Sequence, residues 1–475
     1  AILCAGALMI VLDATIVNVA LPAMQRDLGF GGSSLAWVVN AYLIAFGGVL
    51  LLAGRLGDLL GRRRTFLAGL TVFTLASLAC GLSSSQATLV AARFIQGFGG
   101  AMTSAVVLGM IVTMFTEPRE RTRAISLYSF VASAGASIGL LAGGVLIEAL
   151  DWHWIFFVNV PIGIVTGILT LRVIEDDRGV GLARRVDAIG AVLVTAALMV
   201  GVLTIIRASD VGWTSVETLV GAGIAGLALV AFVVREARTP NPLLPLAIFR
   251  SRAVTGANAV MLLLVAGFFG AFFTGSLYLE RVLRFDALGI GFGFLPVSVS
   301  LGVVSIAFAE PLITRFGPRT VLRASLVVVL VALLWFARLP ADASYLRDVA
   351  PALTLIGIGC GLGFPAIVGL AMSGATRSDA GLASGLVNTT RMVGGSLGLA
   401  AMASIASTRG TALAAAGATP VAALTGGSQA ALLFAAAAVA GAIVVGWTVL
   451  RADAVGASQP AVGSEPSVEV MAEAA

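Results

Sequence analysis

Apolar stretches of about twenty residues recur along nearly the whole chain, a length that suits a helix crossing a membrane. Residues 35–53 and 65–83 are two examples, and neither contains a charged side chain. Hydrophobic residues make up 59% of the 475 and charged residues only 11%. An ordinary soluble domain is about 45–50% apolar and about 25% charged. The pattern therefore predicts a polytopic membrane protein.

Fourteen stretches of this kind are predicted to be transmembrane helices, which makes the fold class all-α. Their centres lie near residues 11, 44, 75, 100, 137, 163, 196, 226, 265, 300, 329, 360, 393 and 438. Polar linkers at 174–186 and 235–252 divide them into six, two and six. The predicted domains are an N-terminal six-helix bundle (1–173), a linker region with two additional transmembrane helices (174–252), a C-terminal six-helix bundle (253–451) and a disordered cytoplasmic tail (452–475).

The basic residues alternate between the two sides of this arrangement. All 29 are arginine; 20 lie in the connections after the even-numbered helices or at Arg451, and seven lie in the other connections. Under the positive-inside rule the arginine-rich side is cytoplasmic. We therefore expect both termini in the cytoplasm and a multi-pass protein of the plasma membrane. The first residue is not methionine and lies in an apolar run, so we also expect native residues ahead of it.

Composition excludes several classes of function. The net charge of +5 follows the arginine connections, so no nucleic-acid surface is indicated. The three cysteines have no paired spacing, and we expect neither a metal nor a cofactor. Gly97–Gly100 lacks the Lys-Ser/Thr pair of a phosphate-binding loop. We expect the protein not to be an enzyme and to draw its energy from an ion gradient.

The densest charged segment joins the second and third predicted helices. It reads Gly54-Arg55-Leu56-Gly57-Asp58-Leu59-Leu60-Gly61-Arg62-Arg63-Arg64. Asp58 stands at a helix boundary, where an arginine or a helix N-terminus could hold its carboxylate. We interpret Gly54, Asp58, Gly61, Arg62 and Arg63 as a conformational gate with Asp58 as its latch. The simpler alternative is that these arginines only orient the chain and bind anionic lipid headgroups.

A weak internal repeat relates the two predicted bundles. Leu312–Arg319 echoes the gate segment when Gly317 is aligned with Gly61. Thr314 then occupies the place of Asp58, so a latch would act in the first half only. Repeats of this kind are typical of transporters whose two bundles rock around a central site.

Three charged residues fall inside predicted spans, and such residues are seldom kept without a use. They are Asp13, Arg93 and Arg391. Asp13 is the leading candidate for a proton site, because burial favours the neutral acid while a nearby arginine favours the carboxylate. Gln96 shares a helical face with Arg93 through its i+3 spacing. The alternative is a permanent Asp–Arg pair that only fixes helix packing.

The chain resembles the major facilitator superfamily and, within it, the fourteen-helix drug:proton antiporter branch. Gly54–Arg64 matches the signature of the loop between helices 2 and 3, and Leu12–Pro22 and Trp152–Gly163 are similar to two signatures of the branch. The resemblance implies a role for Arg93 in proton coupling. At His153 the family usually has arginine. This lone histidine is read as part of an interfacial aromatic belt, with a proton relay as the alternative.

The fifth predicted helix resembles a glycine-rich signature associated with exporters. Gly135, Gly139, Gly143 and Gly144 are expected to let another helix approach closely. Leu140 stands where a proline normally follows, which weakens the inference of export direction. Generic packing of small residues is the alternative.

The function expected is a secondary active transporter, a proton-coupled antiporter that exports amphipathic or cationic small molecules by alternating access. Polar residues predicted to line the substrate cavity are Asn18, Asn40, Tyr42, Gln96 and Arg391. The expected partners are the substrate, protons and membrane lipids, and the chain is expected to be a monomer. Alternatives are a dedicated exporter of an endogenous product such as an antibiotic, siderophore or lipid, an uptake symporter, and a non-transporting scaffold or sensor. Whether Arg391 or Glu280 takes part in coupling is left open.

Overall fold

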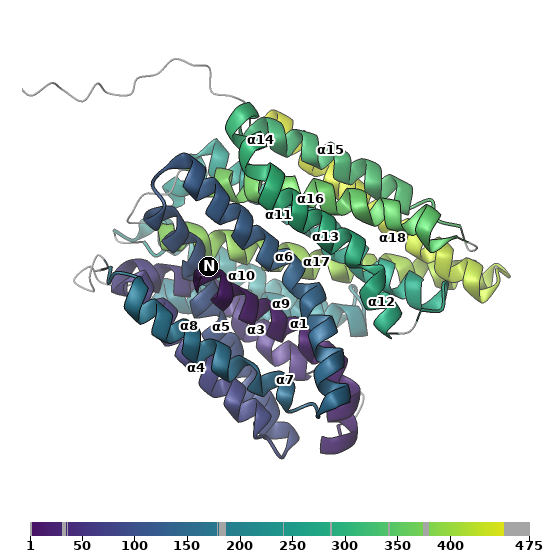
Figure 1. The fold of residues 1–475 in the computed structure, drawn as a ribbon, viewed down its shortest axis with the longest axis horizontal. Helices are drawn as coiled ribbons and strands as arrows, with labels where there is room; N and C mark the ends of the chain where they lie inside the picture. The colour runs from purple at the N-terminus through teal and green to yellow at the C-terminus, as the bar shows by residue number, and fades with distance from the viewer. Residues whose placement is uncertain are drawn as a thin grey trace, which may run out of the picture.

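The computed structural model describes residues 2–30, 35, 37–177, 179, 187–240, 242–285, 287–340, 343–373 and 380–450, and these form helices joined by turns, without a strand. Figure 1 shows two bundles lying side by side. The predicted tail, 452–475, and the side chains of Asn18 and Leu140 lie outside the described part.

The first bundle is formed by the N-terminal helices. These are α1 (Ile2–Leu28), α3 (Trp37–Leu60), α4 (Arg62–Gly81), α5 (Gln86–Met114), α6 (Pro118–Ala149), α7 (Trp154–Phe157) and α8 (Asn159–Val173). Local signals set several boundaries. Ser85 accepts a hydrogen bond from the Thr88 amide and so caps the start of α5. Gly61 separates α3 from α4 with a φ of 102°, a backbone conformation that favours glycine.

The second bundle is formed by the C-terminal helices. These are α11 (Arg252–Arg281), α12 (Ala287–Gly293), α13 (Leu295–Val303), α14 (Ala309–Phe316), α15 (Pro318–Phe336), α16 (Ala350–Met372), α17 (Ala380–Ala415) and α18 (Pro420–Thr448). A π-helical turn at Val304–Phe308 lies between α13 and α14, and another at Tyr345–Val349 precedes α16. A short 3₁₀ turn at Leu246–Arg250 leads into α11. Gly317 has a φ of 80° between α14 and α15, so the repeat reproduces the glycine turn of the gate.

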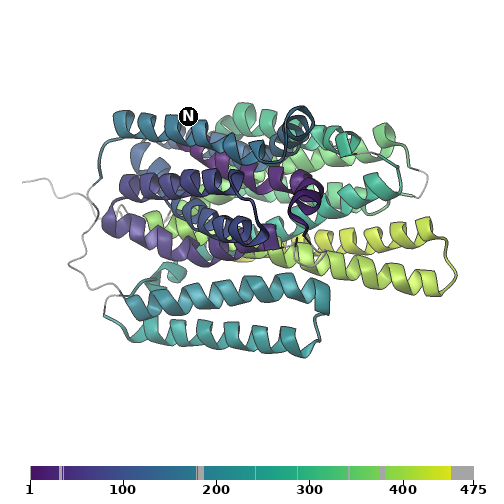
Figure 2. The ribbon, with the colours of Figure 1, turned by 90° about the horizontal axis from the view of Figure 1, so that it is seen from below.

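The two remaining helices form a separate hairpin. They are α9 (Ala188–Val211) and α10 (Val216–Arg238), and Figure 2 shows them as a layer along one edge of the molecule. Helix α9 packs on α3 of the first bundle and on α17 of the second. A β-carbon at Gly48 in α3 would collide with Met199 of α9, so this contact is close.

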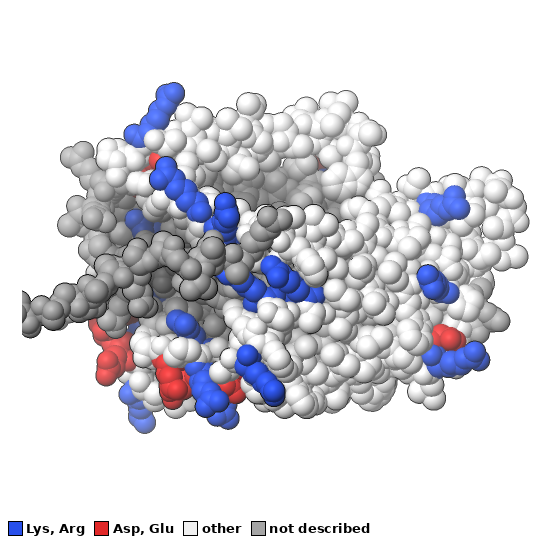
Figure 3. Space-filling view, turned by 90° about the horizontal axis from the view of Figure 1, so that it is seen from above, with Lys and Arg blue, Asp and Glu red and all other residues white. Residues whose placement is uncertain are grey.

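Ten of the described helical segments are long and apolar enough to cross a membrane, or eleven if the bent α1 counts as one span. A membrane-length window of α10 is only 11% buried, so this apolar helix exposes most of its surface. In Figure 3, charged side chains gather over the left part of the face and recur at its right end, with uncharged surface between them. The chain is therefore an all-helical, multi-pass membrane protein.

Glycines allow α1 and α6 to approach closely. A β-carbon at Gly139 would collide with Thr15 Oγ1, and one at Gly135 or Gly143 would lie 2.9 Å from Val11 or 2.8 Å from Ile16. Gly144, the fourth glycine predicted for this contact, is only partly buried. Three of the four glycines thus face α1 within one turn or so of Asp13.

Substitution of Gly139 by alanine should loosen the α1–α6 contact, because overpacking a tight interface costs roughly 1–3 kcal/mol. We expect Gly139→Ala to lower the midpoint of thermal unfolding of the detergent-solubilised protein by several degrees. Gly226→Ala is the matched control, since nothing lies within 4 Å of a β-carbon at that position in α10. Equal midpoints for the two variants would contradict this account of the contact.

Candidate functional site

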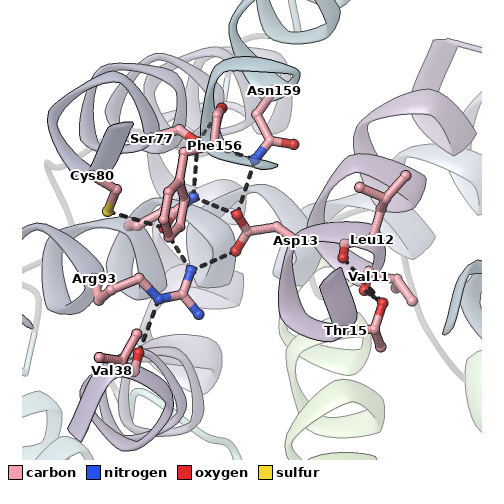
Figure 4. A network of polar contacts seen from close by, with 11 residues as sticks. Val11, Leu12, Asp13, Thr15, Val38, Ser77, Cys80, Arg93, Phe156 and Asn159 are labelled. Carbon is pink, nitrogen blue, oxygen red and sulfur yellow. Dashed lines mark hydrogen bonds and ion pairs between the residues drawn. The ribbon is translucent and has the colours of Figure 1, made fainter. Parts of the chain in front are cut away.

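Asp13 and Arg93 form an ion pair in the interior of the first bundle. Arg93 Nη1 lies 2.7 Å from Asp13 Oδ2, and the side chains are 1% and 0% exposed. Asp13 comes from α1 and Arg93 from α5, so two segments 80 residues apart meet here. Figure 4 shows both side chains pointing toward one another within a wider polar network.

Amide and hydroxyl groups complete the shell around Asp13. Gln96 Nε2 donates to Asp13 Oδ1 at 2.8 Å, and Asn159 Nδ2 donates to the same oxygen at 2.9 Å. Both amides also donate to Ser77 Oγ, at 3.1 and 3.0 Å, and Ser77 donates to the carbonyl of Phe156 at 3.0 Å. Three N–H donors on one carboxyl group stabilise its ionised form.

Arg93 is held on its other sides as well. Its Nε donates to the carbonyl of Val38 at 3.0 Å, and Nη1 also donates to Gln96 Oε1 at 2.7 Å. The guanidinium carbon lies 4.4 Å from the centroid of the Tyr42 ring and 5.8 Å from that of Phe156, within the range of cation–π attraction. Cys80 donates weakly to Gln96 Oε1 at 3.6 Å. The charge pair is therefore enclosed by α3, α4, α5 and α7.

Local sequence explains how Asn159 reaches this network. Helices α7 and α8 are interrupted at Val158, and Asn159 is the first residue of α8. Pro161 follows in the first turn of α8, where the missing N–H costs little because that group has no intrahelical partner. Asn159 is fully buried and faces Asp13. A proton added to Asp13 would remove the counterion of Arg93. It would also turn one carboxyl oxygen of Asp13 from a hydrogen-bond acceptor into a donor.

Asp58 forms a second buried centre, and this one joins the two bundles. Its carboxylate accepts from the backbone amides of Gly381 and Leu382, both at 2.8 Å, at the start of α17. Arg62 donates to it from Nε at 3.1 Å and from Nη2 at 2.8 Å. The helix N-terminus and the arginine foreseen for Asp58 thus both hold it, and the side chain is 0% exposed.

The backbones of α3 and α17 touch beside Asp58. A β-carbon at Gly54 would lie 2.5 Å from the Gly381 carbonyl oxygen, and one at Gly385 would lie 2.9 Å from the Leu50 carbonyl oxygen. The two bundles are therefore closed on one another at this end. In the second copy of the segment, Thr314 instead bonds to Glu310 of its own helix at 3.2 Å.

The start of the linker is bound to the same gate segment. Asp177 accepts from the backbone amides of Arg62 and Arg63, both at 2.9 Å, and so supplies the cap that Gly61 cannot provide for α4. Arg63 donates to the carbonyl of Leu171 at 2.7 Å, and Arg64 pairs with the exposed Asp176 at 2.8 Å. The arginines of the gate thus bind carboxylates and carbonyls of the protein itself.

Several of the predicted site residues meet and others do not. Asp13, Arg93, Gln96 and Tyr42 form one cluster, whereas Arg391 lies apart in α17, in the neighbourhood of Tyr128. Asn388, one turn before Arg391, accepts from Tyr128 at 3.3 Å and donates to the Ser104 carbonyl at 3.2 Å, which links the bundles a second time.

Outside these clusters, Asn40 is partly exposed near the start of α3, and Glu280 is exposed at the end of α11. His153 stacks on Trp152 with ring centroids 3.7 Å apart and bonds to Asp151.

Three site residues were not anticipated: Ser77, Asn159 and Asp177. Asn159 lies inside the Trp152–Gly163 signature. A polar amide at the start of an apolar helix is the signal that could have identified it as a site residue. Ser77 is a single hydroxyl in an apolar stretch, and Asp177 is one of several linker charges, so neither carried a specific signal.

Comparison with known proteins places this geometry in a family. The model of the Major Facilitator Superfamily matches residues 3–399. The chain belongs to the Major Facilitator Superfamily. Among its relatives, the puromycin resistance protein of Streptomyces alboniger is 38% identical over 94% of this chain and 90% of its own length. The cephamycin export protein of Amycolatopsis lactamdurans is 40% identical, over 85% and 83%.

A multidrug resistance protein of Mycobacterium tuberculosis is 35% identical, over 84% of this chain and 74% of its own length. Among solved structures of the superfamily, the human organic anion transporter has a TM-score of 0.67 at 15% identity and covers 94% of this chain and 98% of its own. A proton:xylose symporter has a TM-score of 0.60 at 12% identity, covering 91% and 93%. These likenesses confirm the predicted superfamily and the all-helical membrane fold, and the relatives are resistance and export proteins, in agreement with the predicted branch.

Removal of Arg93 should be tolerated only if the charge of Asp13 is removed as well. Breaking a buried pair leaves one charge uncompensated and costs about 3–5 kcal/mol. We expect Arg93→Leu to reduce the free energy of unfolding, measured by detergent denaturation in mixed micelles, by that order. Asp13→Asn with Arg93→Leu should recover a large part of the loss. Additive losses in the double variant would contradict a buried, mutually dependent pair.

Loss of the Asp58 carboxylate should separate the bundles at the closed end, because two buried helix N-terminal amides and an arginine lose their acceptor. Spin labels at Leu60→Cys and Phe316→Cys report this separation, since both positions are exposed and lie one in each half. We expect Asp58→Ala to lengthen and broaden the interspin distance. The control is Asp176→Ala, which removes an exposed ion pair of the same segment and should leave the distribution unchanged.

Proposed function

We propose that the chain is a proton-coupled antiporter that exports amphipathic or cationic small molecules from the cytoplasm by alternating access. The observation that carries this proposal is the buried Asp13–Arg93 pair with its three N–H donors on the carboxylate. A buried carboxylate that exchanges an arginine for a proton is the simplest element that can link proton movement to helix position.

We also propose the full topology of fourteen crossings with both termini cytoplasmic. Each of the fourteen sequence-derived centres falls within a helix, including α1, α6, α9 and α17, which lie outside the ten apolar spans. We propose 174–252 as a separate region between the two bundles, because α9 and α10 form the separate hairpin. The arginine-rich connections support this orientation.

In this orientation the Asp58 gate lies on the cytoplasmic side, and the structure is closed toward the cytoplasm. Opening to the cytoplasm would break the bonds from Asp58 to Gly381 and Leu382. It would also part the backbones at Gly54 and Gly385. Water would then hydrogen-bond to the Asp58 carboxylate and to the two freed backbone amides. The free-energy difference between the closed and open states would therefore stay small enough for a transport cycle.

Proton binding at Asp13 would alter contacts of several helices together. Arg93 loses its counterion and is left with the Val38 carbonyl, the Gln96 amide oxygen and the Tyr42 ring. The attraction between α1 and α5 weakens, which favours a rearranged bundle. Binding of a cationic or polar substrate favours loss of the proton, and exchange of the two drives transport. Asn18, Asn40 and Arg391 stay proposed liners of the substrate path.

Substrate class is proposed from the relatives' names. They include puromycin resistance, cephamycin export and multidrug resistance proteins. The cephamycin exporter supports the second candidate, a dedicated exporter of an endogenous antibiotic. Membership of a transporter superfamily favours both over a scaffold or sensor. A monomer surrounded by lipid is the proposed working unit.

Asp13→Asn should abolish coupling, because the amide preserves the shape of the carboxyl group and removes its titratable proton. It also leaves Arg93 without its counterion and lowers stability, so the comparison uses only folded, reconstituted protein. We expect proteoliposomes with a trapped pH-sensitive dye to show proton movement on addition of puromycin, and at least a hundredfold less with Asp13→Asn. Glu217→Gln is the control, since Glu217 forms an exposed pair with Arg207 at 3.2 Å. Full proton movement in Asp13→Asn would remove Asp13 from the proposal.

A further inference from the structure

One carbonyl oxygen in the Asp13 network is buried without a hydrogen-bond partner among the described residues, and it belongs to Asn159. The Asn159 amide nitrogen is fully used, at 2.9 Å from Asp13 Oδ1 and 3.0 Å from Ser77 Oγ. Its Oδ1 atom accepts nothing. A buried acceptor left unpaired is unfavourable and calls for an explanation.

Ser77 determines which way the Asn159 amide faces. A hydroxyl has one hydrogen, and Ser77 donates it to the Phe156 carbonyl at 3.0 Å. Ser77 Oγ must therefore accept from its other two neighbours, Gln96 Nε2 and Asn159 Nδ2. An ionised Asp13 also only accepts. The unpaired Asn159 Oδ1 is thus the consequence of an amide that must aim its nitrogen at two acceptors.

We propose that Asn159 is a positioning residue whose amide rotates with the protonation state of Asp13, an inference that rests on the proposed proton coupling. When the site opens, Asp13 takes a proton from water and its carboxyl group gains an O–H. A half-turn of the Asn159 amide then places Oδ1 as the acceptor of that O–H, while water in the opened site accepts from the displaced Nδ2 hydrogens and donates to Ser77 Oγ. On release the proton returns to water, the carboxylate is restored, and the amide turns back. Asn159 therefore stabilises both protonation states in turn.

The titratable groups that act on Asp13 come from three neighbouring helices. They are Arg93 on α5, Tyr42 on α3 and Cys80 on α4. From α6 and α8 no titratable group bonds to Asp13 in the described ranges. Asn159 itself has no titratable proton, so it responds to the proton on Asp13 without competing for it.

Infrared difference spectroscopy tests the switch directly. The full chain, with isotope-labelled asparagine, is reconstituted in liposomes and titrated with acid. We expect a protonated-carboxyl band that is absent in Asp13→Asn. We also expect an asparagine amide carbonyl band that moves to lower wavenumber at the same pH midpoint, because the unpaired Oδ1 becomes hydrogen-bonded. This amide shift should be absent in Asp13→Asn and in Asn159→Leu.

Transport gives a second readout. In Asn159→Leu the ionised Asp13 loses a charge-assisted hydrogen bond, while the neutral acid loses a weaker neutral one. We expect the pH midpoint of transport to move about one unit toward alkaline pH, a tenfold change in proton affinity. Asn258→Leu is the matched control, because Asn258 is another buried asparagine, which bonds to the Val254 carbonyl at 2.9 Å in the second bundle. Its midpoint and amide shift should match the unmodified chain.

The outcomes separate the switch from the proton site. A carboxyl band that titrates without any amide shift overturns the switch and leaves Asp13 as the proton site. Absence of a titrating Asp13 band overturns the proposed proton coupling and the switch with it. If Asn159→Leu does not fold, the comparison of the unmodified chain with Asp13→Asn still decides between these outcomes.

Discussion

A charge pair buried inside an apolar bundle is the constraint on which the first half of this protein depends. Each charge costs about 2.5–3.5 kcal/mol at the centre of a membrane helix. Asp13 and Arg93 offset that cost only because five hydrogen bonds and two aromatic rings hold them. The positions of α1, α3, α5, α7 and α8 are therefore tied to one another through this pair.

Helix α5 connects the charge pair with the interface between the bundles. Arg93 lies near its start, whereas Gly109 packs against the Ala380 backbone and Thr113 accepts from Arg62 at 3.4 Å near its end. Twenty residues of helix separate Arg93 from Thr113, about 30 Å at 1.5 Å per residue. A helix of this length is stiff, so a displacement of α5 at Arg93 would also displace its end beside Arg62.

The sequence predicted the superfamily through its motifs and the helical class through its apolar stretches. It offered a permanent Asp13–Arg93 pair as the alternative to a proton site, because charges are so rare in apolar spans that few partners exist for each. It also predicted that an arginine or a helix N-terminus would hold Asp58. It could not predict that both would do so, since the start of α17 is more than 300 residues away. Ser77 and Asn159 escaped notice because single polar residues in apolar helices are common, and only three-dimensional packing shows what they face.

The linker illustrates why a polar segment should not be read as a passive spacer. Asp177 binds two successive backbone amides at the start of α4, and Asp58 binds two at the start of α17. Each carboxylate thus accepts from the first amides of a helix in a distant part of the chain, and α4 has no capping side chain of its own at Gly61. Burial opposes ionisation of the Asp58 carboxylate, which binds across the interface between the bundles. Asp177 lies in the linker and binds only amides of the first bundle, so its cap can persist when the bundles part. If the Asp58 contact on one side of Gly61 opens as proposed, the linker would still hold α4 in place on the other side through Asp177.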